Sequence, residues 1–452
     1  MPLSDFVPAS RIRSMFSEAM SEMYRLEVPA YADLLEIVRD TNAKVLSSER
    51  VLDLRIDPAE DLNRVSVERH GAIRVGTPAE LSMIRRIFAV MGMVPVGYYD
   101  LGVAGIPVHS TAFRPFERAA LAENPFRVFT SLLRLDLIED AQLRTLAQST
   151  LASRNIFSDD AIQLTEQAER DGGLDPCATE QFVAEVLETF RWAEDAIVSE
   201  ETYEQLHDAH RLIADVVGFQ GPHINHLTPR TLDIDIAQMG MIARDLPAKA
   251  IVEGPPKRRC PILLRQTSFK ALEEKVRFVG AKAPGSHTAR FGEIEERGVA
   301  LTPKGRALYD QLLAEVRGKI LPKPDGSNAD AYVAALANTF EAFPDDWRAL
   351  HDLELAYFRY KAVGEVTKGD LGDLLDSGAI EISPIVYEDF LPVSAAGIFQ
   401  SNLGDNAAGT GISQSSRAQF VAALGAEPAD EFAIYAAIQT ASLKTALGAT
   451  GA

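Results

Sequence analysis

The stretch GPHINHLTPRTLDID at residues 221–235 constrains the fold more than any other part of the chain. Its apolar residues alternate, which predicts a short strand whose successive side chains point to opposite faces. Ile224 and His226 would then share one face, and His223, Asn225 and Leu227 the other. The two histidines therefore cannot both point into one pocket, and either is a candidate metal ligand or a structural histidine.

The second half of this stretch predicts the start of a helix. Thr228 can cap a free backbone amide, and Pro229 fits the first helical turn, where its missing N–H has no partner to lose. We expect the strand to end just after His226 and the helix to span residues 230–241. The stretch would then open a βα unit.

An earlier stretch, VSVERHGAIRV at residues 65–75, also has strand character. His70 precedes Arg74 by four residues, so the two side chains share a face and stand about 13 Å apart. A metal on His70 and an anion on Arg74 could hold the two ends of one short substrate. The alternative is an exposed histidine beside a surface arginine.

The pattern that follows predicts one module of an α+β fold. Thr77, Pro78 and Glu80 form a capping-box signature, and strand-like runs begin at Val94, Gly105 and Phe126, which gives the order βαβββ. A second βαβββ pattern follows residue 221, and helical patterns precede, separate and follow the two modules. We therefore predict N-terminal helices (1–60), a first module (61–137), a helical insertion (138–215), a second module (216–302) and a C-terminal region (303–452).

The last strand of the predicted second module carries alternating carboxylates. In FGEIEERG, Phe291, Glu293 and Glu295 share one face, whereas Ile294 and Glu296 point the other way. Alternation alone cannot choose between Glu293 and Glu295, and a solvated edge strand would show the same pattern. Likewise, His109 in the first module could be a ligand or a structural residue.

Charge and cysteine content exclude several classes of protein. The 65 acidic and 45 basic residues leave a net charge of −20, which repels nucleic acids and anionic lipid surfaces. The two cysteines form no CxxC pair, so neither a disulfide framework nor a zinc ribbon is indicated. The N-terminus lacks the apolar run of a signal peptide, and no later segment has 18 uncharged apolar residues. These features predict a cytoplasmic protein with no membrane partner.

Several motifs resemble one enzyme family. The two βαβββ patterns, with FGEIEERG as the last strand, are similar to the vicinal oxygen chelate superfamily. Over most of the chain, VERHGAIR, GPHINHLTPR, LLRQTSFKAL, FGEIEERGVALTPKGRALYD and YEDFLPVSAAGIFQSNLG resemble the 2-oxoadipate dioxygenase/decarboxylase family. The resemblance implies that His70, His226 and Glu293 bind Fe(II), which selects Glu293 over Glu295. It also implies that Arg74 and the backbone at Val393 and Ser394 bind the substrate.

The resemblance further implies a reaction. Two imidazoles and one carboxylate leave about three iron positions open, enough for a chelating 2-oxo acid and O₂. The expected reaction converts 2-oxoadipate and O₂ to 2-hydroxyglutarate and CO₂. A glyoxalase-like lyase or isomerase and an acidic, metal-free binding protein are the alternatives. The sequence leaves open the oligomeric state and the roles of His109, His223 and Glu295.

Overall fold

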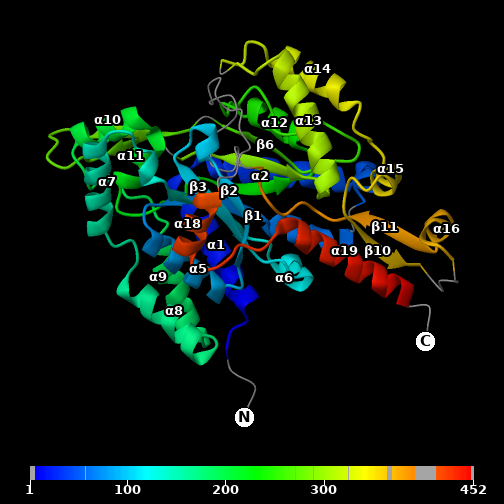
Figure 1. The fold of residues 1–452 in the computed structure, drawn as a ribbon, viewed down its shortest axis with the longest axis horizontal. Coiled ribbons are helices and arrows are strands. Elements are labelled where there is room, and N and C mark those ends of the chain that lie inside the picture. Colours follow the sequence, from blue (N-terminus) through cyan, green and yellow to red (C-terminus); the bar gives the residue numbers. More distant parts are fainter. Residues whose placement is uncertain are drawn as a thin grey trace.

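Seven strands form one continuous sheet in the order β2-β3-β4-β1-β5-β9-β6 (Figure 1). The computed structural model describes residues 6–55, 58–269, 271–288, 290–323, 325–363, 369–391 and 414–448. The strands of this sheet are β1 (Arg69–Val75), β2 (Val94–Asp100), β3 (Val108–Arg114), β4 (Arg127–Leu133), β5 (Leu227–Thr231), β6 (Leu264–Ser268) and β9 (Glu293–Arg297).

The first module has the predicted βαβββ order. Helix α5 (Pro78–Val90) follows β1, and β2, β3 and β4 complete the module. The capping box is confirmed, since the Thr77 hydroxyl accepts a hydrogen bond from the Glu80 amide and the Glu80 carboxylate accepts one from the Thr77 amide. β1 pairs in parallel with β4, whereas β2, β3 and β4 are antiparallel neighbours. β1 therefore forms the inner edge of this module.

The second module repeats the same arrangement with fewer strands in the sheet. β5 pairs in parallel with β9, and β9 pairs antiparallel with β6, with helix α12 (Ile234–Ala243) after β5. The predicted strand run at residues 287–301 splits in two, because β8 (Gly285–Thr288) pairs with β7 (Glu273–Val276) in a separate two-stranded sheet. β1 and β5 join the modules antiparallel to each other.

The predicted strand that ends just after His226 is wrong, because the segment with His223 and His226 forms no strand and precedes β5. Residues 227–231 form β5, and the helix begins at Ile234 with Asp233 as its N-cap, whose carboxylate accepts hydrogen bonds from the Asp235 and Ile236 amides. The reason is tertiary: β5 pairs with β1 on one side and with β9 on the other. Strand pairing on both sides outweighs the local Thr-Pro signal.

The predicted strand at residues 65–75 also begins too early. Helix α4 (Pro58–Val67) occupies its first residues, and β1 starts at Arg69. The apolar residues Val65 and Val67 alternate as in a strand, but Val65 is buried against Val45 and Leu232 in a small cluster beneath the helix. The local pattern was therefore compatible with both structures.

Helices from the N-terminal part of the chain and from the predicted insertion pack around the sheet. The N-terminal helices are α1 (Ala9–Glu27), α2 (Ala30–Leu46) and α3 (Arg50–Leu54), and α6 (Arg118–Glu123) lies between β3 and β4. Short 3₁₀ helices cover Gly102–Ala104 and Leu135–Leu137. The predicted helical insertion contains α7 (Ala141–Ser153), α8 (Asp159–Asp171), α9 (Pro176–Glu188), α10 (Glu200–Ala209) and α11 (Arg211–Val217). α1 packs on α9 and buries Phe16 against Phe190.

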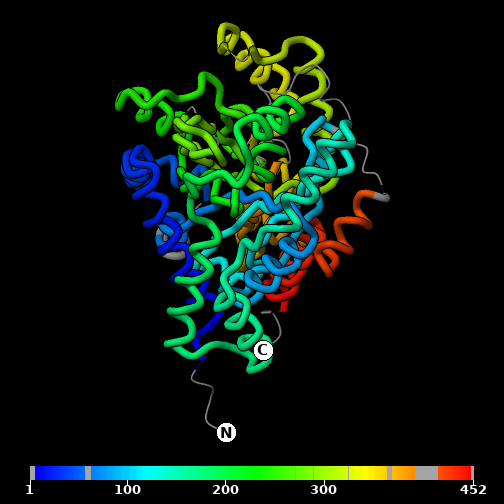
Figure 2. Tube along the Cα trace, turned by 90° about the vertical axis from the view of Figure 1, so that its left-hand side faces the viewer, coloured from blue at the N-terminus to red at the C-terminus, as the bar shows by residue number. Residues whose placement is uncertain are grey.

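Most of the C-terminal region packs around a second hydrophobic core, whereas its helix α18 (Gln414–Leu424) packs on α5 and buries Phe420 and Leu424 in the core of the first module. The region also contains α13 (Pro303–Lys319), α14 (Ala329–Phe340), α15 (Trp347–Asp352), β10 (Phe358–Ala362), α16 (Leu371–Asp376), β11 (Ile380–Pro384) and α19 (Glu431–Gly448). α13 is capped by Thr302, as its Thr-Pro motif predicts. Figures 1 and 2 place α14 and α8 at opposite ends of the molecule, with the seven-stranded sheet between them. Within the described ranges, no helix is long and apolar enough to cross a membrane.

Candidate metal centre

His70 lies where the two modules meet. As the second residue of β1, it stands opposite Arg127 on β4 and Thr228 on β5, and its side chain is fully buried. The next residue is Gly71, where a Cβ would come within 3.1 Å of the carbonyl oxygen of His226. The glycine therefore allows the segment before β5 to lie directly against β1, which brings His226 close to His70.

The segments that carry His226 and Glu293 are held together by the N-terminal helix. The hydroxyl of Tyr24 on α1 donates to the carbonyl oxygens of Asn225, 3.1 Å away, and Phe291, 2.8 Å away. The Phe291 amide also donates to the Asn225 carbonyl, and the Asn225 amide donates to that of Ala72 on β1. These bonds fix the backbone on either side of the site.

His70, His226 and Glu293 each offer a ligand atom, and these atoms lie within 4.8 Å of one another. Nε2 of His70 is 3.1 Å from Oε1 of Glu293, and Nε2 of His226 is 3.8 Å from the same oxygen. All three side chains are buried. Two imidazoles and one carboxylate at this spacing match the ligand set of mononuclear non-haem metal sites.

The hydrogen bonds of His226 and Glu293 indicate whether a metal fits between the three side chains. Thr228 and Gln266 donate to Oε1 of Glu293, each at 2.9 Å. Within the described residues, Oε2 of Glu293 and both ring nitrogens of His226 are buried without a hydrogen-bond partner. Buried polar atoms without a partner are costly, and a metal bound to one ring nitrogen of His226 and to Oε2 of Glu293 would satisfy two of these three atoms. The donor set therefore fits a divalent metal.

Glu295 lies on the same side of β9 as Glu293 but has a different partner. Its Oε2 is 3.0 Å from Nδ1 of His70, while Arg297 donates to its carboxylate at 2.8 Å. A proton on Nδ1 of His70 would be held by this carboxylate, which leaves the Nε2 lone pair for a metal. With a metal bound to His70, Glu295 would orient a ligand rather than act as one.

Burial and charge set the protonation of the two histidines. Desolvation lowers the pKa of His226 to about 4, so the imidazole is neutral near pH 7, as metal binding requires. Burial alone would also lower the pKa of His70, but Glu295 and Glu293 together raise it. A metal must therefore displace a proton from His70 more often than from His226.

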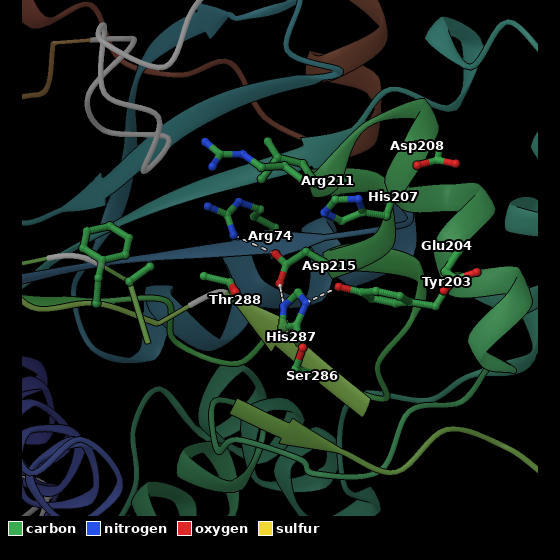
Figure 3. Close-up of a pocket in the computed structure, with 13 residues that line it drawn as sticks. Arg74, Tyr203, Glu204, His207, Asp208, Arg211, Asp215, Ser286, His287 and Thr288 are labelled. Atoms are coloured by element: carbon green, nitrogen blue, oxygen red, sulfur yellow. Dashed lines mark hydrogen bonds and ion pairs between the residues drawn. The ribbon is translucent and has the colours of Figure 1, made fainter. Parts of the chain in front are cut away.

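A cavity of about 560 Å³ lies beside the metal centre (Figure 3). Its lining includes Arg74 of β1 and Phe291, whose ring lies 4.8 Å from that of His226. Arg74 is buried, and its Nη1 donates to Oδ2 of Asp215 at 2.6 Å. The structure therefore places the arginine predicted to bind substrate in the wall of a cavity that adjoins the predicted metal ligands.

His223 belongs to a second buried group. Its Nε2 lies 3.2 Å from Oδ1 of Asp215, which is also 3.0 Å from Nε2 of His287, and Tyr203 and Nδ1 of His287 are 2.6 Å apart. The prediction that His223 and His226 point into different sites is confirmed by their positions. Asp215 is already paired with Arg74, so this group is accounted for as a network that anchors Arg74.

The other predicted residues have separate outcomes. His109 packs against Phe420 and Tyr98, and burial lowers its pKa to about 4. It lies outside both groups of ligand-type residues found in the described part of the chain. Val393 and Ser394 fall outside the described residues. Sequence reasoning missed Gln266, although the motif LLRQTSFKAL contains it.

The paired modules define an α+β fold of the vicinal-oxygen-chelate type, and the two histidines and one carboxylate where they join could hold a metal. Comparison with known sequences resolves the particular family. The chain belongs to the 2-oxoadipate dioxygenase/decarboxylase family, whose model matches residues 16–402.

Its relatives resemble it over nearly their full length. The 2-oxoadipate dioxygenase/decarboxylase of Pseudomonas putida is 56% identical over 453 residues, which cover 98% of each chain. The Escherichia coli protein of the same name is 53% identical over 441 residues, covering 96% of this chain and 97% of the relative. The crystal structure of the Pseudomonas putida hydroxyglutarate synthase in complex with 2-oxoadipate aligns with a TM-score of 0.92 at 54% identity and covers 100% of both chains.

Proposed function

We propose that this chain is an Fe(II)-dependent dioxygenase that converts 2-oxoadipate and O₂ to 2-hydroxyglutarate and CO₂. The observation that carries the proposal is the buried group of His70, His226 and Glu293 in a chain of this family. The reaction balances: the C1 carboxylate leaves as CO₂, one oxygen atom of O₂ enters the new carboxylate and the other forms the hydroxyl group. No separate co-substrate is required.

Bound iron would supply the activation of O₂, because three protein ligands leave about three positions for the 2-oxo acid and O₂. The chain's own residues would hold that site in place. Thr228 and Gln266 fix one oxygen of Glu293, and Glu295 fixes the ring of His70. Such outer hydrogen bonds typically contribute 10- to 100-fold to metal affinity or activity.

Arg74 would bind the carboxylate of 2-oxoadipate that lies far from iron. A guanidinium carries five N–H donors in a planar fork that matches a carboxylate, and Asp215 takes the donor at Nη1. Asp215 therefore fixes the orientation of the fork before substrate arrives. From the family resemblance, the backbone at Val393 and Ser394 would complete substrate binding.

The alternative of a glyoxalase-like lyase or isomerase is less well supported. Its relatives in this superfamily usually hold a redox-inert metal through four protein ligands, whereas the group at this site has three. The full-length relatives are named dioxygenases/decarboxylases. A cytoplasmic location also stays a proposal, supported by the composition alone.

Oxygen consumption tests the proposal directly. Metal-free protein is loaded with Fe(II) under argon, mixed with 2-oxoadipate and monitored with an oxygen electrode, while CO₂ and 2-hydroxyglutarate are quantified. We expect one O₂ consumed for each CO₂ and each 2-hydroxyglutarate formed, and no turnover with Zn(II). Alanine at His70, His226 or Glu293 should abolish both iron binding and turnover. A Glu293→Ala variant that kept iron and activity while Glu295→Ala lost both would show that the carboxylate was wrongly assigned.

A further inference from the structure

The cavity beside the metal centre contains a second arginine in addition to Arg74. Arg211 is the first residue of α11 in the helical insertion, and it lines the same cavity. Figure 3 shows the guanidinium groups of Arg74 and Arg211 extending to the same side of this cavity. The carboxylates of Glu204 and Asp208, which also line it, lie toward the opposite end.

The two arginines have different partners. Arg74 is buried and paired with Asp215, whereas Arg211 is exposed and, within the described residues, forms no ion pair. Partial desolvation by the cavity wall and the nearby charge of Arg74 lower the pKa of Arg211, and Asp215 only partly opposes them. The two guanidinium groups therefore lie in one cavity with different surroundings.

We propose that Arg211 is a specificity-determining residue that binds the remote carboxylate of the substrate together with Arg74. The inference rests on the proposed function, because it assumes a dicarboxylate held at the metal by its other end. At this end of the cavity the carboxylate would lie beside two guanidinium groups, which can donate charge-assisted hydrogen bonds to it.

Kinetics of three variants test this role. Arg211→Ala should lower kcat/KM for 2-oxoadipate about 5- to 30-fold, mainly through KM. Arg211→Lys should lower kcat/KM less than Arg211→Ala does. The rate with 2-oxohexanoate, the monoacid of the same length, should change less than twofold. Arg170→Ala is the matched control, because Arg170 is an exposed arginine of the inserted helices that lies outside this cavity.

Ionic strength provides a second readout, which a purely structural role would not change. The fall of kcat/KM for 2-oxoadipate with added salt should be shallower in Arg211→Ala than in the wild type and Arg170→Ala. An unchanged preference for 2-oxoadipate over 2-oxohexanoate in Arg211→Ala, with an unchanged salt dependence, would overturn the inference. A wild-type enzyme that consumed no O₂ with 2-oxoadipate would instead overturn the proposed function, so the two failures are distinguishable.

Discussion

Replacing Glu295 by glutamine separates the orientation of a metal ligand from metal binding itself. The carboxylate lies 3.0 Å from Nδ1 of His70, Nε of Arg297 donates a hydrogen bond to it at 2.8 Å, and Nη2 of Arg297 forms an ion pair with it at 2.8 Å. Glutamine keeps the shape but removes the negative charge. We expect the variant to fold, to bind iron more weakly and to be less stable without metal.

The pKa of Glu295 sets the size of the stability effect. Burial alone would raise this pKa, but the charges of Arg297 and His70 bring it from 4.5 to about 2. A lowered pKa for an acid means that its stabilisation is present above the unfolded value and is lost as pH falls from about 4.5 to about 2. At 1.36 kcal/mol per pKa unit, Glu295→Gln should lower the free energy of unfolding by about 3 kcal/mol at pH 7.5. Iron affinity should fall about 10- to 100-fold.

The assay combines urea unfolding of the metal-free proteins with anaerobic titration of Fe(II). Glu296→Gln is the matched control, since Glu296 is also buried on β9 but pairs with Arg265, 3.0 Å away, on the other side of the strand. Its iron affinity should equal that of the wild type. If Glu295→Gln bound iron as tightly as Glu296→Gln, Glu295 would not orient His70 and the reasoning would be refuted.

Three further predictions concern other parts of the chain. Arg74→Ala and Arg74→Lys should lower kcat/KM for 2-oxoadipate about 10- to 200-fold at normal iron content; an unchanged preference over 2-oxohexanoate in both would remove Arg74 from the substrate site. Burial and the charge of Asp389 raise the pKa of Glu431 to about 8. Between about pH 4.5 and 8 the folded state therefore binds more protons than the unfolded chain, and the protein loses stability as pH rises. Glu431→Gln should therefore stabilise the protein at pH 8 more than at pH 5 in thermal melts, and equal shifts would contradict this. Thr77→Ala should cost about 1 kcal/mol in urea unfolding, whereas Thr77→Ser should cost little, because the serine hydroxyl keeps the cap.

Much of the fold could be predicted from local signals. Short-range chemistry predicted the capping box of α5 and the strand runs from Val94, Gly105 and Phe126, which contain β2, β3 and β4. Periodicity also predicted the helical character of the insertion. Such features form from residues close together in the sequence, so they leave a clear pattern there.

The site needed more than local signals. Thr228 carries a helix-cap pattern, yet it lies in β5 and donates to Glu293, because strands far away in sequence pair on both sides of it. Alternation predicted that Glu293 and Glu295 share one face of the strand, and both do. The proposed roles differ only because His70 turns Nε2 toward Glu293 and Nδ1 toward Glu295. The family resemblance selects Glu293, which lies in the buried group with His70 and His226, and its role as a ligand stays a prediction.

The antiparallel pairing of β1 with β5 has a consequence for synthesis on the ribosome. β1 can pair with β4 as soon as the first module emerges, but its other edge must wait for β5, about 150 residues later. At about 5–20 residues per second, this delay lasts about 8–30 s. During that interval the nascent chain presents an unpaired strand edge that carries His70, and such edges template aggregation. The helical insertion is translated within this interval and therefore lengthens the time for which that edge stays unpaired.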